Sequence, residues 1–483
     1  MKTTALFWVA AALLLWLSGC KEGEKVGNTP PETTIFVQEI NLTGEDRLPS
    51  EVQLYWSGED KDGIVEGFEI SFDNQQWDFV TVTDSTFRFD IPPNTDTLDI
   101  ELWVRAIDDD GQADPSPAYL RIPIKNRPPS AVFNQTLSPN DTNLIVLTLS
   151  YAITDPDGDQ SVNSVELKLN DGDWQSISPN FDVVSLVPEN PTQTGPQNAR
   201  VLAGPTLADI GVSLNDYRVG GDNVIYIRAQ DQGLLFSEVD TSETFHVLQQ
   251  TSDVLYLDNW GSDNISPLPR EVFIPTLSSA QMYGSLDVID LTDTNYVAKA
   301  GNLTYGPLFE QYDKIFWVIQ EDQLEIFGES EQVLNEHLNQ GGKLFLLINP
   351  PDSIPPASPF FRITGADSVS SVFQNALLAN QGQGRLIPDS SLGDVAYPTI
   401  PNNNLFSLNG LTPFYPTQTA EPIYTANITQ GNGEEWQATK VFFIRQRVAA
   451  NTNQIFGTMR FHAFENPTEI ESFFLTVKQE FDW

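Results

Sequence analysis

A repeated order of motifs constrains this 483-residue chain more than any other feature of its sequence. Four marks occur twice in the same order: Asn28-Thr29-Pro30-Pro31 and Asn126-Arg127-Pro128-Pro129, Asp60–Gly63 and Asp155–Gly158, Trp77 and Trp174, and Trp103–Ala106 and Tyr226–Ala229. Such self-similarity predicts two copies of one folding unit. The last pair is further apart than the others by about 26 residues, so the second copy carries an insertion near 178–221.

Short runs of alternating apolar and polar residues within each copy predict β-strands. Val52–Trp56 and Phe68–Phe72 alternate in this way, and turn residues separate them. Many short strands at regular spacing are typical of antiparallel β-sandwiches. The sequence therefore predicts one sandwich over 30–126 and a second, which contains the insertion, over 127–250.

These two units resemble fibronectin type III or related Ig-like domains. The resemblance is carried by the runs W-S-G-E-D-K-D-G (56–63) and W-V-R-A-I-D-D-D-G (103–111), and by Asp114–Ala118. It covers roughly residues 30–250. It implies a spacing or binding role of the kind that such tandem modules have in bacterial surface lipoproteins, and it leaves the ligand open.

Clustered carboxylates in the turns of both copies raise the question of calcium, which binds six to eight hard oxygen ligands. The candidates for metal ligands are Asp60, Asp62, Asp155, Asp157 and Asp159. The alternative is an ordinary Asp/Gly turn, in which each aspartate accepts hydrogen bonds from nearby backbone amides. A calcium ion here would stiffen the fold rather than catalyse a reaction, and the sequence predicts no other cofactor.

The pattern changes at residue 253, where compact apolar runs predict buried parallel strands. Such runs lie at Val254–Leu257, Leu286–Leu291, Tyr312–Ile319 and Lys343–Ile348. A helix is predicted before the last of these, with Ser330 as its N-cap and Gly341-Gly342 at its end. A strand, a helix and a second strand in this order predict a βαβ crossover and a parallel sheet. The expected fold class is therefore two antiparallel β-sandwiches followed by a parallel-sheet α/β sandwich over 253–483.

The segment from Tyr312 to Ile348 resembles the class I glutamine amidotransferase-like fold, a flavodoxin-like α/β sandwich. Active members of that family carry a cysteine nucleophile just after the strand that corresponds to Lys343–Ile348. Here that strand continues into Asn349-Pro350-Pro351, and the domain contains no cysteine. A nucleophile of this kind has no substitute among its neighbours, so the family's chemistry is not expected.

A ligand crevice is still expected beyond the carboxyl ends of the parallel strands, where open α/β sheets bind their ligands. The strand ends present Asp258, Trp260, Glu321, Asp322 and Asn349, and the alternative is a solvated loop rim. The three histidines are too scattered to form a metal site. Residues 351–440 are predicted to form long loops, with a weak helix at Ala366–Leu378, and such loops often carry recognition surfaces.

The N-terminus predicts export. Ala5–Leu17 is an uncharged run of 13 residues, short of the ~20 that a spanning helix needs, and it suits a secretory signal. Leu17-Ser18-Gly19-Cys20 then resembles a bacterial lipobox. The resemblance implies cleavage of the signal peptide 1–19, lipidation of Cys20, and a flexible linker over 20–29.

The residues behind Cys20 bear on location. Lys21 stands where an aspartate would resemble an inner-membrane retention signal, so delivery to the outer membrane is favoured. The acidic tract that follows resembles the export signal of surface lipoproteins in Bacteroidetes-type bacteria. The expected location is the outer membrane or the cell surface, with the ectodomain outside the bilayer.

The formal net charge of −41, from 25 basic and 66 acidic residues, argues against binding to nucleic acid or to an anionic lipid surface. The first functional hypothesis is a non-catalytic surface lipoprotein whose β-sandwiches present an α/β head to a glycan or an envelope protein. A second is a glycan- or ester-hydrolysing enzyme that uses the strand-end carboxylates. A third is a structural subunit of an envelope assembly.

Overall fold

The computed structural model describes residues 27–37, 47–92, 95–134, 137, 141–261, 267–292, 301–320, 324–351, 354–370, 376–449 and 451–482. The predicted signal peptide and Cys20 lie outside these residues. The chain forms two compact units: the first comprises Met1–Pro129 with Thr154–Asn163 and Gln230–Phe236, and the second comprises Ser130–Ile153, Ser164–Ala229 and Ser237–Trp483. No helix in the described ranges is long and apolar enough to cross a bilayer.

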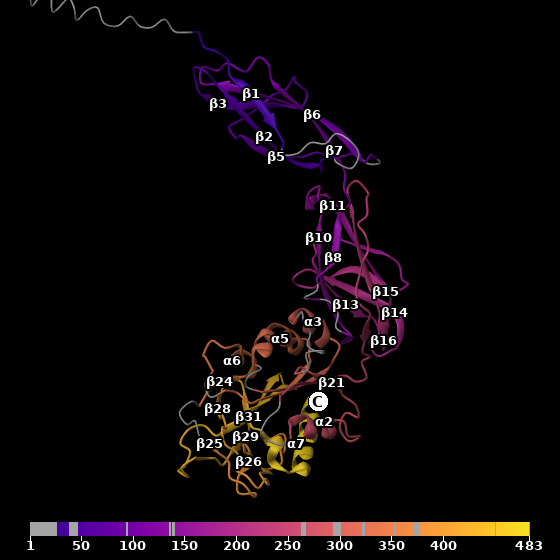
Figure 1. Ribbon diagram of the computed structural model, residues 1–483. Coiled ribbons are helices and arrows are strands. Elements are labelled where there is room, and N and C mark those ends of the chain that lie inside the picture. Colours follow the sequence, from indigo (N-terminus) through magenta and orange to yellow (C-terminus); the bar gives the residue numbers. More distant parts are fainter. Residues whose placement is uncertain are drawn as a thin grey trace, which may run out of the picture. The chain divides into compact units, whose positions relative to one another are not determined.

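Two antiparallel sheets form the β-sandwich of the first unit (Figure 1). One contains β1 (Glu32–Phe36), β2 (Glu51–Glu59) and β5 (Asp84–Arg88), and the other contains β4 (Asp78–Val80), β3 (Val65–Ser71), β6 (Thr97–Asp108) and β7 (Ala118–Lys125). Alternate residues of each strand point inward, because successive side chains of a strand lie on opposite faces. Leu54, Trp56, Leu102, Val104 and Ile122 form the centre of this core.

The second β-sandwich is larger than the first because of the predicted insertion. Its main sheet contains β15 (Ala208–Val219), β14 (Gly195–Ala203), β13 (Val183–Pro188), β10 (Leu147–Thr154) and β8 (Ser130–Phe133). Two smaller sheets accompany it, one of β12 (Gln175–Ile177), β11 (Val162–Leu169), β17 (Ile225–Asp231) and β18 (Asp240–Thr241), and one of β16 (Gly221–Asn223), β19 (Phe245–Val247) and β9 (Thr142–Asn143). The insertion thus extends a sheet, and the multidomain β prediction is confirmed.

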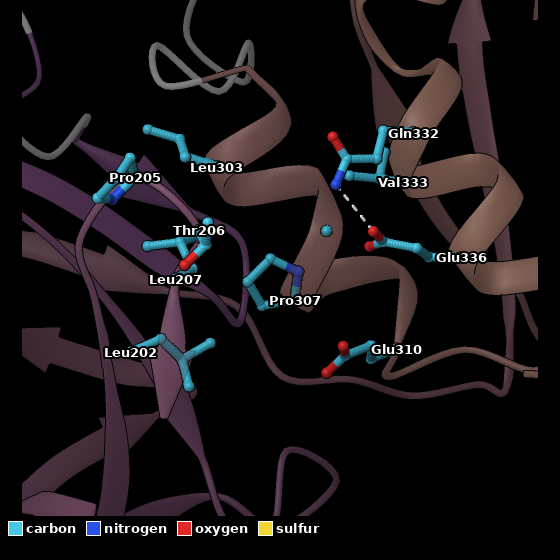
Figure 2. Close-up of a pocket in the computed structure, with 11 residues that line it drawn as sticks. Leu202, Pro205, Thr206, Leu207, Leu303, Pro307, Glu310, Gln332, Val333 and Glu336 are labelled. Atoms are coloured by element: carbon cyan, nitrogen blue, oxygen red, sulfur yellow. Dashed lines mark hydrogen bonds between the residues drawn. The ribbon is translucent and has the colours of Figure 1, made fainter. Parts of the chain in front are cut away.

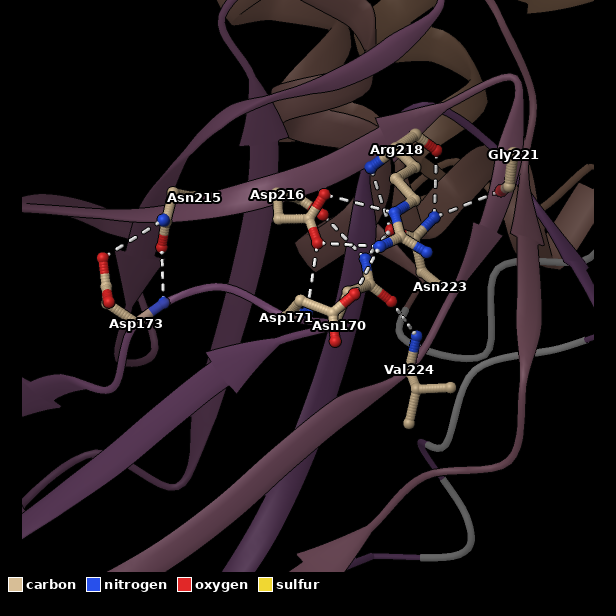
Figure 3. Close-up of polar contacts among 9 residues, drawn as sticks. All are labelled: Asn170, Asp171, Asp173, Asn215, Asp216, Arg218, Gly221, Asn223 and Val224. Carbon is tan, nitrogen blue, oxygen red and sulfur yellow. Dashed lines mark hydrogen bonds and ion pairs between the residues drawn. The ribbon is translucent and has the colours of Figure 1, made fainter.

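A network of polar side chains closes the end of the insertion (Figure 3). The Asn170 amide donates to the backbone oxygen of Asp216 at 2.7 Å and to Asn223 Oδ1 at 2.9 Å. Arg218 pairs with Asp216 at 2.9 Å and with Asp171 at 3.2 Å. Asn170 and Asp216 adopt positive φ angles, which asparagine and aspartate tolerate better than most residues. The side-chain amides thus replace ladder hydrogen bonds where the chain leaves the sheet, which gives this cluster a structural role.

A nine-stranded sheet dominates the C-terminal region. Its strands follow the order β21 (Asp287–Asp290), β20 (Val254–Asn259), β22 (Lys314–Ile319), β23 (Lys343–Ile348), β32 (Asn451–Gly457), β31 (Val441–Val448), β29 (Glu421–Ala426), β26 (Arg385–Pro388) and β27 (Ile400–Pro401). The first five strands pair in parallel, and the remaining pairs are antiparallel.

Helices cover both faces of the parallel strands, which explains their continuous apolar sequences. On one face, Tyr256, Phe316 and Phe345 share a core with α2 (Pro269–Leu277) and α7 (Pro467–Phe481). On the other face, Leu257, Trp317 and Leu346 share a core with α3 (Asn302–Phe309), α5 (Glu331–Asn339) and α6 (Pro359–Thr364). The predicted helix after Ser330 is α5, and α4 (Leu324–Glu329) precedes it.

The second β-sandwich and this C-terminal region share one hydrophobic core. Val146, Val187 and Leu202 of the sandwich belong to the same cluster as Tyr305 and Leu308 of α3. The hydroxyl groups of Thr148 and Ser185 reach the backbone oxygen of Leu303, at 3.4 and 3.2 Å. The second unit is therefore a single packed body in which the helix α3 lies against the sandwich.

The prediction of long loops over 351–440 is wrong for much of that segment. It supplies β26, β27 and β29 to the large sheet, and two further strand pairs: β24 (Ala366–Val369) with β28 (Phe414–Pro416), and β25 (Ala376–Leu377) with β30 (Thr429–Gln430). The predicted helix at 366–378 is also wrong, because Gly365 ends α6 with a φ of 76° and the chain continues as β24. Residues 371–375 lie outside the described ranges.

Candidate functional site

The carboxyl ends of β20 and β21 bring two aspartates to one arginine. Asp258 ends the apolar part of β20, and Asp290 is the last residue of the neighbouring parallel strand β21. Arg270, in the first turn of α2, donates to Asp258 Oδ2 at 2.8 Å and to Asp290 Oδ2 at 3.2 Å. The parallel pairing places both carboxylates at the edge where ligands of open α/β sheets bind.

Asp258 lies in an enclosed position at this edge. Its side chain is only 1% exposed, and burial raises the pKa of its carboxyl to about 6, although Arg270 opposes the shift. The backbone N–H of Trp260 donates to its other oxygen at 3.2 Å. The group titrates close to neutral pH, but it is enclosed and both of its oxygens are engaged.

Trp260 belongs to the core instead of presenting a surface for stacking. It is 1% exposed, and its ring lies edge-on to His462 with 5.2 Å between centroids. His462 is itself buried in a 3₁₀-helix, Phe461–Phe464. Burial lowers the pKa of His462 to about 3, so the imidazole is neutral at physiological pH. The two rings therefore pack together inside the protein, and Trp260 offers no exposed ring to a ligand.

The remaining predicted crevice residues are less informative. Glu321 and Asp322 lie outside the described residues. Asn349 follows β23 and is half-buried, and its backbone N–H donates to the Ile319 carbonyl at 2.9 Å. Sequence reasoning missed Asp290, because the predicted strand Leu286–Leu291 extended past it, whereas the observed strand ends at Asp290. It also missed Arg270, because α2 was not predicted despite Pro269 at its start and Glu271 in its first turn.

The aspartates in the acidic turns of the first unit accept hydrogen bonds from backbone amides. Asp62 accepts from Thr29 N–H at 3.1 Å, and the corresponding Asp157 of the second repeat accepts from Arg127 N–H at 2.7 Å. Asp157 also accepts from the backbone N–H of Ser50. Each carboxylate thus replaces a missing backbone acceptor near the start of its repeat.

Three other predicted calcium ligands follow the same turn pattern. Asp60 accepts from Asp62 N–H at 3.2 Å, Asp155 from Asp157 N–H at 2.8 Å, and Asp159 from Asp155 N–H at 3.1 Å. No three acidic, histidine or cysteine side chains in the described ranges are arranged to hold a metal ion. Calcium binding by these turns stays a prediction.

A pocket of about 160 Å³ lies within the second unit, between the second β-sandwich and the helices α3 and α5 (Figure 2). Its wall on the sandwich side is the turn after β14, and its other walls are helical. It is lined by Leu202, Pro205, Thr206, Leu207, Leu303, Gly306, Pro307, Glu310, Gln332, Val333 and Glu336. We call it the glutamate pocket, because an apolar floor meets two carboxylates.

The two glutamates of the glutamate pocket carry its charge. Burial raises the pKa of the Glu310 carboxyl, and the nearby Glu336 raises it further, while Arg200 opposes the shift. Gln332 Nε2 donates to Glu336 Oε1 at 2.9 Å, which fixes that side chain one turn along α5 (Figure 2). A second carboxylate beside Glu310 disfavours the ionised form of Glu310, and a cation bound there would relieve that repulsion.

Comparison with known proteins gives little further guidance. No family model matches the chain, and no curated protein matches it. Among solved structures, the chain is 13% identical to the PKD1 domain of Vibrio anguillarum Epp, over 20% of this chain and 96% of that one, with a TM-score of 0.15. It is 14% identical to fibronectin(III)-like modules of Clostridium thermocellum CbhA, over 45% and 95%, with a TM-score of 0.16.

A third similar structure is the Bacteroides ovatus protein SGBP-B, from a mixed-linkage glucan utilization locus, in complex with a mixed-linkage heptasaccharide. The identity is 10% over 48% of this chain, the TM-score is 0.13, and the chain spans about half (52%) of that protein. Likeness of this extent says nothing about what the present chain binds.

Proposed function

We propose that the protein is a non-catalytic, lipid-anchored protein of the outer membrane or cell surface, and that its second unit is a head that binds a partner protein. The glutamate pocket is the observation that carries this proposal. If the partner protein is bound permanently, the protein would be a structural subunit of an envelope assembly.

The proposed head includes a doubly wound α/β domain. In chain order, its parallel strands lie 2-1-3-4-5 across the sheet, from β21 through β20, β22 and β23 to β32. This is the strand order of flavodoxin-like folds. Helices on both faces of the same strands support the assignment.

A non-catalytic role is supported by the state of the strand-end edge. Asp258, whose pKa lies near neutrality, is enclosed beside Trp260 and bound to Arg270. A general acid has to come within hydrogen-bond distance of the substrate atom that it protonates. The chain's single cysteine is the proposed site of the lipid, so no thiol is left to act as a nucleophile.

The size of the glutamate pocket suggests its occupant. Ligand pockets for whole small molecules measure about 300–1,000 Å³, whereas this one measures about 160 Å³. It suits a single inserted side chain. Leu202 and Val333 offer an apolar surface for an aliphatic stem, and Glu310 and Glu336 offer charge for its cationic end. The occupant we propose is a lysine or arginine side chain of the partner.

The test uses n-butylammonium, which has the shape and charge of a lysine side chain, with n-butanol and butyrate as comparison probes. Saturation-transfer NMR on the full chain in detergent should detect n-butylammonium in preference to both. We expect the double variant Glu310→Gln/Glu336→Gln to lose this signal. Acidification should weaken it as well, because the raised pKa of Glu310 neutralises that carboxylate earlier than an ordinary glutamate.

The matched control is Glu434→Gln/Glu435→Gln, which changes the net charge equally at two exposed positions away from the pocket. This control should bind the probe as the natural chain does. Equal binding of n-butanol and n-butylammonium, or equal loss in both double variants, would contradict the proposal.

A further inference from the structure

One face of the first β-sandwich exposes large aromatic side chains to solvent. On the sheet β4-β3-β6-β7, Phe79 is 53% exposed and Tyr119 is 50% exposed, and Trp77 and Trp103 are half-buried. We call these four residues the aromatic face. A contiguous exposed apolar surface on a soluble domain usually marks an interaction site.

Strand register places the four rings on one face of the sheet. Trp103 on β6 pairs with Tyr119 on β7, and the two ring centroids lie 5.2 Å apart. Phe79 on β4 pairs with Glu69 on β3, and its ring lies over Gly67, which has no side chain to cover it. The Arg105 guanidinium lies over Trp77, 4.2 Å from the ring centroid, and binds Glu69 at 2.6 Å. Trp103 and Tyr119 therefore form a ring pair, and Phe79 lies on the neighbouring residue row of the same face, beside the Arg105–Glu69 ion pair and Trp77.

The second sandwich contains the same ladder and serves as an internal comparison. Arg228 lies 4.4 Å from the Trp174 ring centroid and binds Glu166 at 2.6 Å, as Arg105 does with Trp77 and Glu69. The shared arginine, tryptophan and glutamate therefore stabilise the sheet in both repeats. They do not distinguish one repeat as a binding site.

The first repeat differs by the aromatic residues around that ladder. The partner of Glu166 across the strands is Ser176, where the first repeat has Phe79 opposite Glu69. The partner of Tyr226 is Thr241, where the first repeat has Tyr119 opposite Trp103. The extra rings thus occur only in the first repeat, on a surface where the same ladder forms without them.

The second repeat also covers its rings with a cation. Lys168 Nζ lies 5.4 Å from the Trp174 centroid and 4.7 Å from the Tyr226 centroid. The corresponding residue of the first repeat is Ser71, whose hydroxyl donates to Asp73 at 3.0 Å. A serine is too short to cover the Trp103 ring, so Trp103 has no counterpart of the lysine that lies over Tyr226, whereas the arginine over the tryptophan is common to both repeats.

The polar groups around the aromatic face carry little net charge. Arg105 pairs with Glu69 and Arg121 pairs with Asp99, both at 2.6 Å, and the Tyr119 hydroxyl donates to Glu101 at 2.9 Å. These groups offer donors and acceptors to a ligand without favouring an ion. The chain's charge of −41 disfavours polyanions as well.

We infer that the aromatic face of the first sandwich binds a neutral polysaccharide. The apolar faces of pyranose rings pack on aromatic rings, and their hydroxyl groups bond to the carboxylates and guanidinium groups beside them. This surface goes beyond the proposed function, because it assigns binding to the sandwich nearest the predicted anchor in sequence. It does not depend on the glutamate pocket.

Isothermal titration calorimetry on the full chain in detergent tests the inference. The probes are four neutral hexasaccharides, of cellulose, laminarin, mannan and amylose type, and an oligogalacturonate as the anionic comparison. We expect at least one neutral probe to bind and the oligogalacturonate not to bind. Tyr119→Ala and Phe79→Ala should each weaken that binding about three- to tenfold.

The matched control is Phe36→Ala. Phe36 is 51% exposed and stacks on Tyr55 at 5.5 Å, on the opposite sheet of the same sandwich. It should leave binding unchanged. A further variant, Ser71→Lys, places a cation where Lys168 lies in the second repeat and should also reduce binding. Failure of all four neutral probes, preference for the anion, or equal loss in Phe36→Ala would overturn the inference, whatever the n-butylammonium experiment shows.

Discussion

Asp258 makes the stability of the second unit depend on pH in an unusual direction. The folded chain holds the Asp258 proton up to about pH 6, whereas an unfolded aspartate releases it near pH 3.8. Unfolding therefore releases a proton between these values, and this group's contribution to stability falls as the pH rises through the window. Ionisation of Asp258 in the folded chain lowers the free energy of unfolding by about 3 kcal/mol at most.

We expect Asp258→Asn to remove this dependence. The free energy of unfolding, measured with urea between pH 4 and pH 7, should fall for the natural chain relative to the variant as the pH rises to about 6. Above that pH the difference should stay constant. Asp290→Asn is the control, since it removes the more exposed partner of the same arginine. A pH-independent difference between the natural chain and Asp258→Asn would refute the assignment.

Single residues also show where the repeat could be read from the sequence and where it could not. The paired positions of Trp77 and Trp174 are visible in the sequence. In the structure an arginine at the corresponding position of each repeat lies over the tryptophan ring, Arg105 over Trp77 and Arg228 over Trp174. The asparagines of the two Pro-Pro motifs are visible too, and each amide donates to a buried aspartate: Asn28 to Asp108 and Asn126 to Asp231. Their partners lie far along the chain, and no local pattern indicates them.

At the scale of elements, the C-terminal helix α7 is fastened to β31 by a buried ion pair. Arg445 on β31 binds Glu480 on α7 at 2.7 Å, and both side chains are only 2% exposed. Tyr397 donates to Glu480 at 2.8 Å, and Thr452 donates to its other oxygen. The pair thus joins the last helix to the point where parallel and antiparallel strands of the large sheet meet.

Glu480→Gln should destabilise the second unit by about 1.5–3 kcal/mol, because it removes the buried carboxylate partner of Arg445 and leaves the half-exposed Asp394 and Glu421. Glu421→Gln removes a half-exposed partner of the same arginine and should cost at most about 1 kcal/mol. Urea denaturation followed by tryptophan fluorescence compares the two. Replacing both charges, in Arg445→Met/Glu480→Met, should recover most of the loss; equal effects of the two glutamine variants would refute this account.

The elements differed in how well the sequence predicted them. The parallel strands and α5 were predicted, because burial on both faces gives strands long apolar runs and because α5 has clear start and stop residues. The strands of 351–440 were missed: β25, β27 and β30 have two residues each, too few to show a period. Of the site, Asp258 was found from its strand, whereas the glutamate pocket joins residues more than 100 positions apart.

At the scale of the whole molecule, one residue sets the predicted location. We expect the natural chain, expressed in a bacterium with a lipoprotein pathway, to incorporate alkyne-palmitate and to fractionate with membranes. Cys20→Ser should abolish the labelling and release the chain from the membrane, since no other cysteine is available to carry the lipid. Stable anchoring needs more than one acyl chain, so a partly acylated chain would also be released. Retention of label in Cys20→Ser would refute lipidation at this site.

The charge of the whole molecule complements its two proposed surfaces. An excess of acidic residues keeps the chain soluble and repels polyanions, so the binding surfaces have to work by apolar contact, paired charges or a captured cation. The aromatic face offers apolar contact and paired charges, and the glutamate pocket offers a site for a cation. Each surface lies within one compact unit.

The turn 154–163 lies in the second repeat by sequence, yet it belongs to the first compact unit. Asp157 of that turn accepts hydrogen bonds from the amides of Ser50 and Arg127. A fragment that stops at residue 129 would therefore lose acceptors that its own backbone uses. The two repeats share a sequence pattern, but the first repeat is not an independent module. A protein design that truncates the first repeat or transfers it to another chain would have to include residues 154–163 of the second repeat.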